Sequence, residues 1–183
     1  MAQVLKVDKM KDLFRLYFIR LYQDIPTEVY EGILSLFCIG TVGLFIIFGW
    51  KRAWRKDSGL LLVEYVILIY CSTVVFREYS ENVGHDFSPF WSYRAIGNGR
   101  DDLLAENLMN VVVFVPVGLL LSCVSHRLKW RMVLLIGLGI SLSIEALQYF
   151  YHKGFSEFDD VFHNTLGCAI GIIIVVVIKR IWL

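Results

Sequence analysis

The sequence lacks an excess of charge of either sign, because 18 basic side chains stand against 17 acidic ones in 183 residues. Apolar residues make up 57% of the chain and charged residues only 19%. A disordered chain is too poor in apolar residues to match this composition, and a nucleic-acid-binding chain carries a positive excess. Both classes are excluded, and no nucleic acid is expected as a partner.

Charge is almost absent from five runs of 18 to 20 residues, which cover 94 residues and contain only Glu64 and Glu145. Each run has the length that an α-helix needs to cross the bilayer hydrocarbon, roughly 20 residues. In a soluble domain, five such helices would have almost no polar face for water, and a membrane β-barrel has short alternating strands instead. The predicted spans are 32–50, 59–76, 107–125, 132–151 and 161–178.

Residues 1–31, before the first span, predict a helix of a different kind. Apolar residues recur there at helical spacing opposite basic ones, which is typical of a helix lying flat in the headgroup region. The segment lacks the apolar core and small-residue cleavage site of a signal peptide, so we expect it to be retained. The predicted fold is all-α, a polytopic integral membrane bundle of about five transmembrane helices in residues 32–183 with this N-terminal amphipathic interfacial helix.

Small residues and a proline inside the spans indicate how the helices pack. Gly167 and Gly171 have the GxxxG spacing that lets two helices approach closely, and we favour packing within the chain over a dimer seam. Pro116 interrupts the third span and frees the carbonyl of Val112. The cysteines all lie inside spans without metal-ligand spacing, so they are predicted to be packing residues. They are Cys38, Cys71, Cys123 and Cys168.

Basic residues predict the orientation in the membrane. The connections around residues 51–58 and 126–131 and the C-terminal Lys179-Arg180 are basic, whereas the connection 77–106 has six acids against three arginines. By the positive-inside rule the basic connections face the cytoplasm, and the connections 77–106 and 152–160 face outward. The five basic residues of segment 1–31 fall on the outer side and weaken this asymmetry.

Polar side chains gather toward the outward ends of the last three spans. Because these spans alternate in direction, their positions place them near one membrane surface. An ionised Glu145 in the bilayer costs at least about 2.5 kcal/mol, so we expect it to be protonated, paired or in a wet cavity. Two interpretations are open, a polar cluster that holds the helices in register and a cavity for a polar ligand, and we favour the cavity. The candidate residues are Asn107, Asn110, Glu145, Gln148, Asp159, Asp160 and Asn164.

The outward connection supplies further candidates for the same site. Arg77, Arg94 and Arg100 are the expected partners of Glu145, unless a bound cation takes that place. A divalent cation at Glu145 and Asp160 is the one cofactor that the residues suggest, since hard cations prefer oxygen ligands. Residues 85–100 mix these arginines with aromatic side chains, Trp91 among them, which fits either a segment dipping beside the cavity or a plain interfacial belt.

At these residues the sequence resembles the VanZ-like family. The likeness covers about half the chain, in the order that the family shows. It is carried by four motifs, Phe87-Ser88-Pro89-Phe90, Asn107-xx-Asn110-xxx-Phe114-x-Pro116-x-Gly118, Glu145-xx-Gln148 and Asp159-Asp160-xxx-Asn164-Thr165-Leu166-Gly167. This chain departs from the family before the acidic pair, where relatives often have an arginine and it has Lys153-Gly154-Phe155, and lysine cannot make an arginine's bidentate contact.

The resemblance implies a multi-pass protein of the bacterial plasma membrane, associated with low-level resistance to the glycopeptide teicoplanin. The function that we favour is binding, in the outward cavity, of a lipophilic or lipid-linked envelope molecule, such as a cell-wall precursor or a lipoglycopeptide, besides membrane lipids. The alternative is a metal-assisted enzyme acting on a lipid phosphate or pyrophosphate, but no catalytic motif is recognised. A small transporter is less favoured, because no inverted repeat is detectable.

Overall fold

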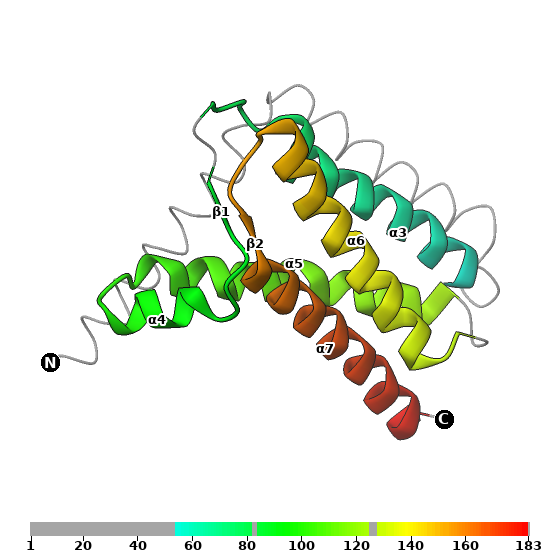
Figure 1. The fold of residues 1–183 in the computed structure, drawn as a ribbon. Coiled ribbons are helices and arrows are strands. Elements are labelled where there is room, and N and C mark those ends of the chain that lie inside the picture. Colours follow the sequence, from blue (N-terminus) through cyan, green and yellow to red (C-terminus); the bar gives the residue numbers. More distant parts are fainter. Residues whose placement is uncertain (1–53, 82–83, 125–127, 183) are drawn as a thin grey trace, which may run out of the picture.

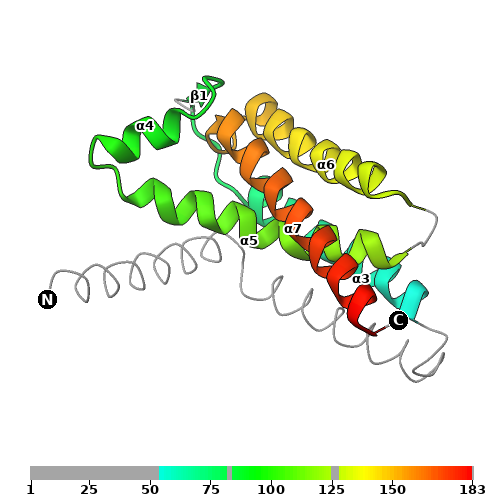
Figure 2. The ribbon, with the colours of Figure 1, turned by 90° about the horizontal axis from the view of Figure 1, so that it is seen from below.

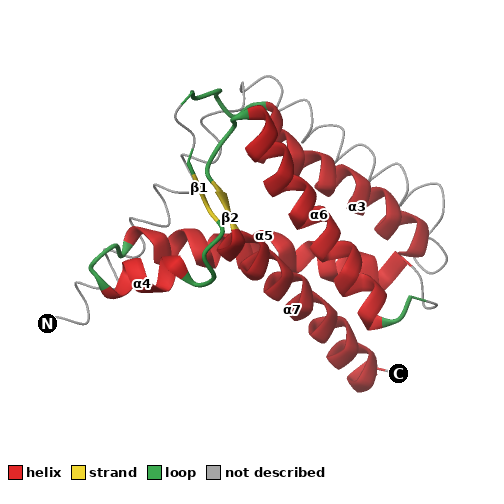
Figure 3. Cartoon of the chain, in the orientation of Figure 1, coloured by secondary structure: helices red, strands yellow, loops and turns green. Residues whose placement is uncertain are grey.

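The computed structural model describes residues 54–81, 84–124 and 128–182 (Figure 1). The predicted N-terminal helix and the first predicted span lie outside the described residues, as does Cys38. Figure 3 shows helices joined by loops, with one short pair of strands. Its elements are α3 (Trp54–Tyr70), η1 (Cys71–Val75), β1 (His85–Asp86), α4 (Trp91–Gly97), α5 (Asp102–Val124), α6 (Trp130–Tyr151), β2 (Ser156–Glu157) and α7 (Phe158–Trp182).

Four helices in the described residues are long and apolar enough to cross a membrane. They cover Ser58–Val75, Asp102–Val124, Trp130–Tyr151 and Phe158–Arg180, which confirms the all-α membrane fold. All four helices begin earlier than the apolar runs, and α5 at Asp102 and α7 at Phe158 do so with acidic side chains in their first turns. The acids in these first turns interact favourably with the positive end of the helix dipole, so the helices extend beyond the apolar residues.

Helices α5 and α7 pack with their backbones in close contact. A Cβ added to Gly167 would lie 2.1 Å from the carbonyl oxygen of Val111, and one added to Gly171 would lie 2.2 Å from that of Val115. On the α5 side, a Cβ at Gly118 would lie 2.0 Å from the carbonyl oxygen of Cys168. The glycines at GxxxG spacing therefore serve packing within the chain, and only glycine fits where the two helices meet.

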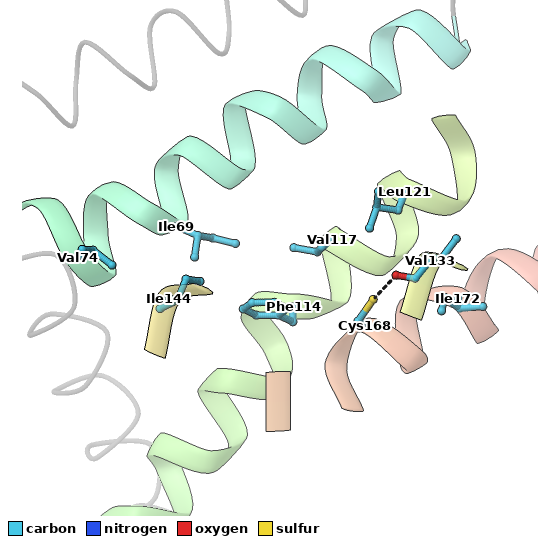
Figure 4. Close-up of a cluster of buried hydrophobic side chains, with 9 residues drawn as sticks. All are labelled: Ile69, Val74, Phe114, Val117, Leu121, Val133, Ile144, Cys168 and Ile172. Carbon is cyan, nitrogen blue, oxygen red and sulfur yellow. Dashed lines mark hydrogen bonds between the residues drawn. The ribbon is translucent and has the colours of Figure 1, made fainter. Parts of the chain in front are cut away.

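An apolar core joins α3, α5, α6 and α7 (Figure 4). Phe114 and Val117 of α5 lie at its centre, 2% and 0% exposed, and the thiol of the fully buried Cys168 donates a weak hydrogen bond to the Val133 carbonyl at 3.8 Å. Cys71 and Cys123 are half-buried free thiols. The described cysteines thus act as packing residues, as predicted.

Two loops that are distant in the sequence form the only strand pair in the described residues. His85 and Asp86 of β1 pair in parallel with Ser156 and Glu157 of β2, and β2 leads directly into α7 (Figure 1). The sequence analysis did not predict this pair, because strands of two residues are too short to show an alternating pattern. Its consequence is that the connection before α4 is fixed to the start of α7.

Residues 85–100, predicted as an interfacial segment, contain the short helix α4. An Asx turn precedes it, in which the Ser88 amide donates to Oδ1 of Asp86 at 2.8 Å. Phe90 then has a left-handed backbone with φ of 60°, which is unusual for an aromatic residue and needs support from its surroundings. Figure 2 shows α4 beside the N-terminal part of α5.

Candidate functional site

Asp159 holds the start of α4 in place from the first turn of α7. Its Oδ1 accepts a hydrogen bond from the Phe90 amide at 2.6 Å, and its Oδ2 accepts from the amide and hydroxyl of Ser92 at 2.9 and 2.6 Å. Asn107 of α5 completes the chain by donating to the Ser92 hydroxyl at 3.1 Å. Asp159 and Ser92 are fully buried. The carboxylate of Asp159, a predicted site residue, therefore has its hydrogen-bond donors within the protein.

Glu145 connects α6 to the strand that precedes α7. Its Oε2 accepts a hydrogen bond from the Glu157 amide at 2.9 Å, while the Ser156 hydroxyl donates to the Glu145 carbonyl at 3.1 Å. Glu157 in turn accepts from the indole Nε1 of Trp91 at 2.7 Å. The two glutamates are only 6% exposed, which places a pair of buried carboxyl groups between α4, α6 and α7.

Asp160 and Asn164 have separate partners on neighbouring helices. The amide of Asn110 on α5 donates to Oδ1 of Asp160 at 2.6 Å. The amide of Asn164 donates to the hydroxyl of Ser141 on α6 at 2.9 Å. Asp160 is half-buried, unlike the fully buried Asp159, so the two adjacent acids occupy different environments.

Gln148 ties α6 to the π-helical turn η1. Its Nε2 donates to the Thr73 carbonyl at 3.0 Å, whereas its buried Oε1 has no hydrogen-bond partner among the described residues. Lys153 extends the same junction, because its ammonium donates to the Val75 carbonyl at 2.7 Å. A single π turn within an otherwise α-helical segment is frequent at functional sites.

The predicted arginine contacts divide into two groups. Arg77 lies against Gly154, whose added Cβ would meet Nη1 at 2.3 Å, and its charge acts on Glu145 and Asp160. Arg100 instead forms an exposed ion pair with Asp102 at 2.8 Å, and Arg94 is exposed. We define the acidic cluster as Glu145, Glu157 and Asp160. Of the three predicted arginines, Arg77 is the one whose charge acts on Glu145 and Asp160.

Sequence reasoning missed two serines and the contact between His163 and Tyr93. Ser92 and Ser141 are fully buried and bind three of the predicted residues, but serine is common in loops and packing faces, so no pattern singled them out. His163 stacks on Tyr93 with 5.6 Å between ring centroids, and its Nε2 lies 2.8 Å from the Tyr93 hydroxyl. This contact also depends on α4, which the sequence did not predict as a helix.

The described residues do not present a set of side chains that could hold the suggested divalent cation. No group of three or more His, Cys, Asp or Glu side chains in the described ranges has an arrangement that could hold a metal ion. Asp159 is occupied by donors, and Glu145 and Asp160 each accept from the protein. A cation at Glu145 and Asp160 would have to draw its further ligands from other sources.

Exposed aromatic side chains occur in the loops and helix ends that carry the acidic cluster. Aromatic rings in these segments touch in pairs, such as Phe90 with Phe162 at 5.3 Å and the half-buried Trp91 with Phe155 at 5.9 Å between ring centroids. Aromatic side chains prefer the depth of the lipid headgroups. The members that are more than a third exposed form the aromatic collar, which consists of Phe87, Phe90, Tyr93, Tyr149, Phe155, Phe158 and Phe162.

The comparisons with known proteins agree with this architecture. A sequence model of the family described as VanZ/LLP1 matches residues 60–179, which is more than half of the chain. The chain belongs to the VanZ/LLP1 family. Protein VanZ of Enterococcus faecium is 31% identical over 80 residues, 44% of this chain and 47% of that protein. The chain thus spans about half the length of this curated relative, and no solved structure matches it.

The VanZ/LLP1 match begins within α3 and ends near the end of α7, so it includes every residue of the acidic cluster. With four helices that are long and apolar enough to span a membrane, this VanZ/LLP1 protein is a multi-pass membrane protein.

We expect the Glu157 carboxyl, which lies before the membrane-spanning part of α7, to titrate near neutral pH. Burial raises the pKa of Glu157 from 4.5 to about 7; the Trp91 hydrogen bond opposes this shift, and the Glu106, Glu145 and Asp159 carboxylates add to it. The raised pKa favours the protonated folded state, so this contribution to stability is full below pH 4.5 and is lost as the pH rises through about 7.

The titration is measurable through Trp91, whose indole donates to Glu157. In a variant that keeps Trp91 and has phenylalanine at the other four tryptophans, emission should change with a midpoint near pH 7. Glu157→Gln should abolish the change, while Glu81→Gln, at an exposed position, should preserve it. A midpoint near 4.5 in the parent would show that the Glu157 carboxyl is not buried as described.

Proposed function

We propose that the acidic cluster and the aromatic collar together bind a lipophilic or lipid-linked molecule of the cell envelope. The observation that carries this proposal is that buried carboxyl groups and exposed aromatic rings occur on the same segments at one end of the apolar helices, where the Trp91 indole donates to Glu157. Aromatic side chains suit an acyl chain at headgroup depth, and the polar groups suit its head group. An amphiphile meets both requirements.

The proposed orientation places this end of the bundle on the outer side of the membrane. Lys129 and Arg131 lie at the start of α6, and Lys179 and Arg180 at the end of α7, both at the opposite end from Asp160. Basic connections stay in the cytoplasm under the positive-inside rule. A ligand would then reach the cluster from the outer leaflet, where envelope precursors and external antibiotics are found.

The VanZ-like resemblance suggests reduced susceptibility to teicoplanin as the biological outcome. Teicoplanin is a glycopeptide that carries an acyl chain, which vancomycin lacks. Binding through the aromatic collar would therefore favour teicoplanin, or a lipid-linked precursor that competes with it. This proposal concerns the described part of the chain, which corresponds to about half of the Enterococcus relative.

Expression in a susceptible Gram-positive host tests the proposal. We expect cells that produce the chain to require a several-fold higher teicoplanin concentration for inhibition, with little change for vancomycin. Glu145→Gln with Asp160→Asn should remove the difference, because both carboxylates are lost, whereas the exposed Glu81→Gln with Asp101→Asn should retain it. Unchanged inhibition by both antibiotics, with the protein present in the membrane, would contradict the resistance function. An equal shift for both would contradict a role for the acyl chain.

A further inference from the structure

The acidic cluster has no neutralising cation in direct contact. Among the described residues, no lysine or arginine nitrogen lies within 4.0 Å of a carboxylate oxygen of Glu145, Glu157 or Asp160. Glu145 and Glu157 are nevertheless only 6% exposed. Burying an unpaired carboxylate in a low-dielectric site costs several kcal/mol, roughly, for each ion. The cluster therefore calls for protons or for a positively charged ligand.

Two basic side chains of the neighbouring loops, Lys153 and Arg77, form no ion pair with the cluster. The Lys153 ammonium donates to the Val75 carbonyl at 2.7 Å, and the Arg77 guanidinium lies against Gly154. Arg77 acts on Glu145 and Asp160 only through its electric field, at more than ion-pair distance. It weakens the negative potential of the cluster without occupying it.

A separate observation indicates that a hydrogen-bond donor is missing. Gln148, one helical turn after Glu145 on α6, is 3% exposed, and its buried Oε1 has no partner in the described part of the chain. Buried polar atoms are almost always hydrogen-bonded, so each exception needs an explanation. The amide oxygen requires a donor, and the neighbouring carboxylates require positive charge.

A primary ammonium group has the chemistry that both needs require. It carries one positive charge and three N–H donors, whereas a quaternary ammonium group carries the charge without donors. The described residues offer no group of three or more side chains suited to a metal ion, which makes a metal a poorer occupant. The aromatic collar beside the cluster suits a hydrocarbon chain attached to the ammonium group.

We infer that the acidic cluster, with Oε1 of Gln148, binds the primary ammonium group of an amphiphile whose hydrocarbon chain lies against the aromatic collar. This inference rests on the proposed function and specifies the ligand's chemical class. A lipid with an amine head group and a lipoglycopeptide with a free amine share this chemistry.

Binding of hexadecylamine to the purified full chain in detergent tests the inference. We expect hexadecylamine to bind about tenfold more tightly than N-acetylhexadecylamine or hexadecyltrimethylammonium, since charge-assisted hydrogen bonds are lost in both analogues. Native mass spectrometry measures the three affinities at equal detergent concentration. Equal binding of all three compounds would overturn the inference without any need for a variant.

Substitutions locate the site. Glu145→Gln and Asp160→Asn should each remove the preference for the primary amine, and Glu81→Gln and Asp101→Asn should keep it. Thermal unfolding of each variant shows whether it is folded, and only folded variants are compared. A preference that survives in folded Glu145→Gln and Asp160→Asn chains would place the amine elsewhere and overturn the inference, leaving protons as the occupants of the cluster.

Competition distinguishes the two sources of the ligand and separates the two proposals. Displacement of hexadecylamine by phosphatidylethanolamine indicates a lipid, and displacement by teicoplanin indicates the lipoglycopeptide. Either result supports the inference, and displacement by neither overturns it for natural amphiphiles. Amine binding without a change in teicoplanin susceptibility would contradict the resistance function alone, whereas a teicoplanin effect without amine preference would contradict this inference alone.

Discussion

Replacing Gly167 with leucine is expected to prevent α7 from packing on α5. The added Cβ alone would lie 2.1 Å from the Val111 carbonyl oxygen and 3.0 Å from the Cβ of Phe114, and neither is the movable end of a side chain. The two backbones would have to separate along their contact, with a loss of stability of about 3 kcal/mol or more. Thermal unfolding in detergent, followed by size-exclusion chromatography, measures this loss.

Gly139→Leu on α6 is the matched control for this substitution. A Cβ at Gly139 meets nothing within 4 Å among the described residues, and leucine is a better helix former than glycine. We therefore expect the control to be as stable as the parent or slightly more stable. If Gly167→Leu unfolded at the same temperature as Gly139→Leu, the close packing of α5 and α7 would be wrong.

Asp159→Asn is expected to detach α4 from the helix bundle. The carboxylate accepts three hydrogen bonds, from the Phe90 amide and from the amide and hydroxyl of Ser92. An asparagine side chain has one acceptor oxygen, and its NH2 group would replace the other carboxylate oxygen. That NH2 group would then face a buried N–H or O–H donor. Losing charge-assisted bonds and leaving a donor unpaired should cost about 3 kcal/mol. Unfolding measurements and the emission of Trp91 in the single-tryptophan background report the two effects.

Asp160→Asn, at the adjacent acid, is the matched comparison for Asp159→Asn. Asp160 is half-buried and accepts one described hydrogen bond, from Asn110. Asp160→Asn should therefore cost less stability than Asp159→Asn and should leave the environment of Trp91 unchanged. Asp101→Asn, at an exposed position, should have no effect on either measurement. Equal losses at positions 159 and 160 would show that the two acids are not divided as described.

This division explains why so many polar side chains occur at the ends of apolar helices. Part of the polar network is structural, because Asp159, Ser92 and Asn107 satisfy one another inside the protein. Such a network fixes the position of α4 and with it Phe90 and Tyr93, two members of the aromatic collar. The acidic cluster remains as the part with carboxylates that lack a contacting cation. The alternative interpretation, a structural polar cluster, thus fits Asp159, Ser92 and Asn107, whereas the favoured cavity stays a prediction for the acidic cluster.

Much of the fold was predictable from the distribution of charge. Hydrocarbon excludes charged groups, so helices that cross it must be uncharged for about 20 residues, and this requirement is visible in any sequence. The alternation of spans then placed Asn110, Glu145 and Asp160 toward one end of the bundle. Helix boundaries were less accurate, since Asp102 and Phe158 begin helices that extend beyond the apolar runs.

The contacts of the candidate site were not predictable in the same way. The β1–β2 pair and α4 bring residues 85–92 against residues 155–159, and neither short element has a sequence period of its own. Only the folded structure identifies Ser92 as a partner of Asp159 and Asn107, and Ser141 as a partner of Asn164. Arg77 and Arg100 belong to the same acidic connection, so the sequence could not distinguish them. The tertiary structure places Arg77 against Gly154 and pairs Arg100 with Asp102.

The balance of 18 basic against 17 acidic side chains, and the near absence of charge from long runs, determined by themselves that this chain is an all-α membrane protein. The tertiary structure decided which polar residues form hydrogen bonds with one another and which carboxylates lack a contacting cation among the described residues. The physical reason is that exclusion of charge from hydrocarbon acts on each segment separately, whereas a hydrogen bond requires two groups at about 3 Å. Asp159 and Asp160 are adjacent acids in the sequence, and only the folded chain gives the first three hydrogen-bond donors and the second one.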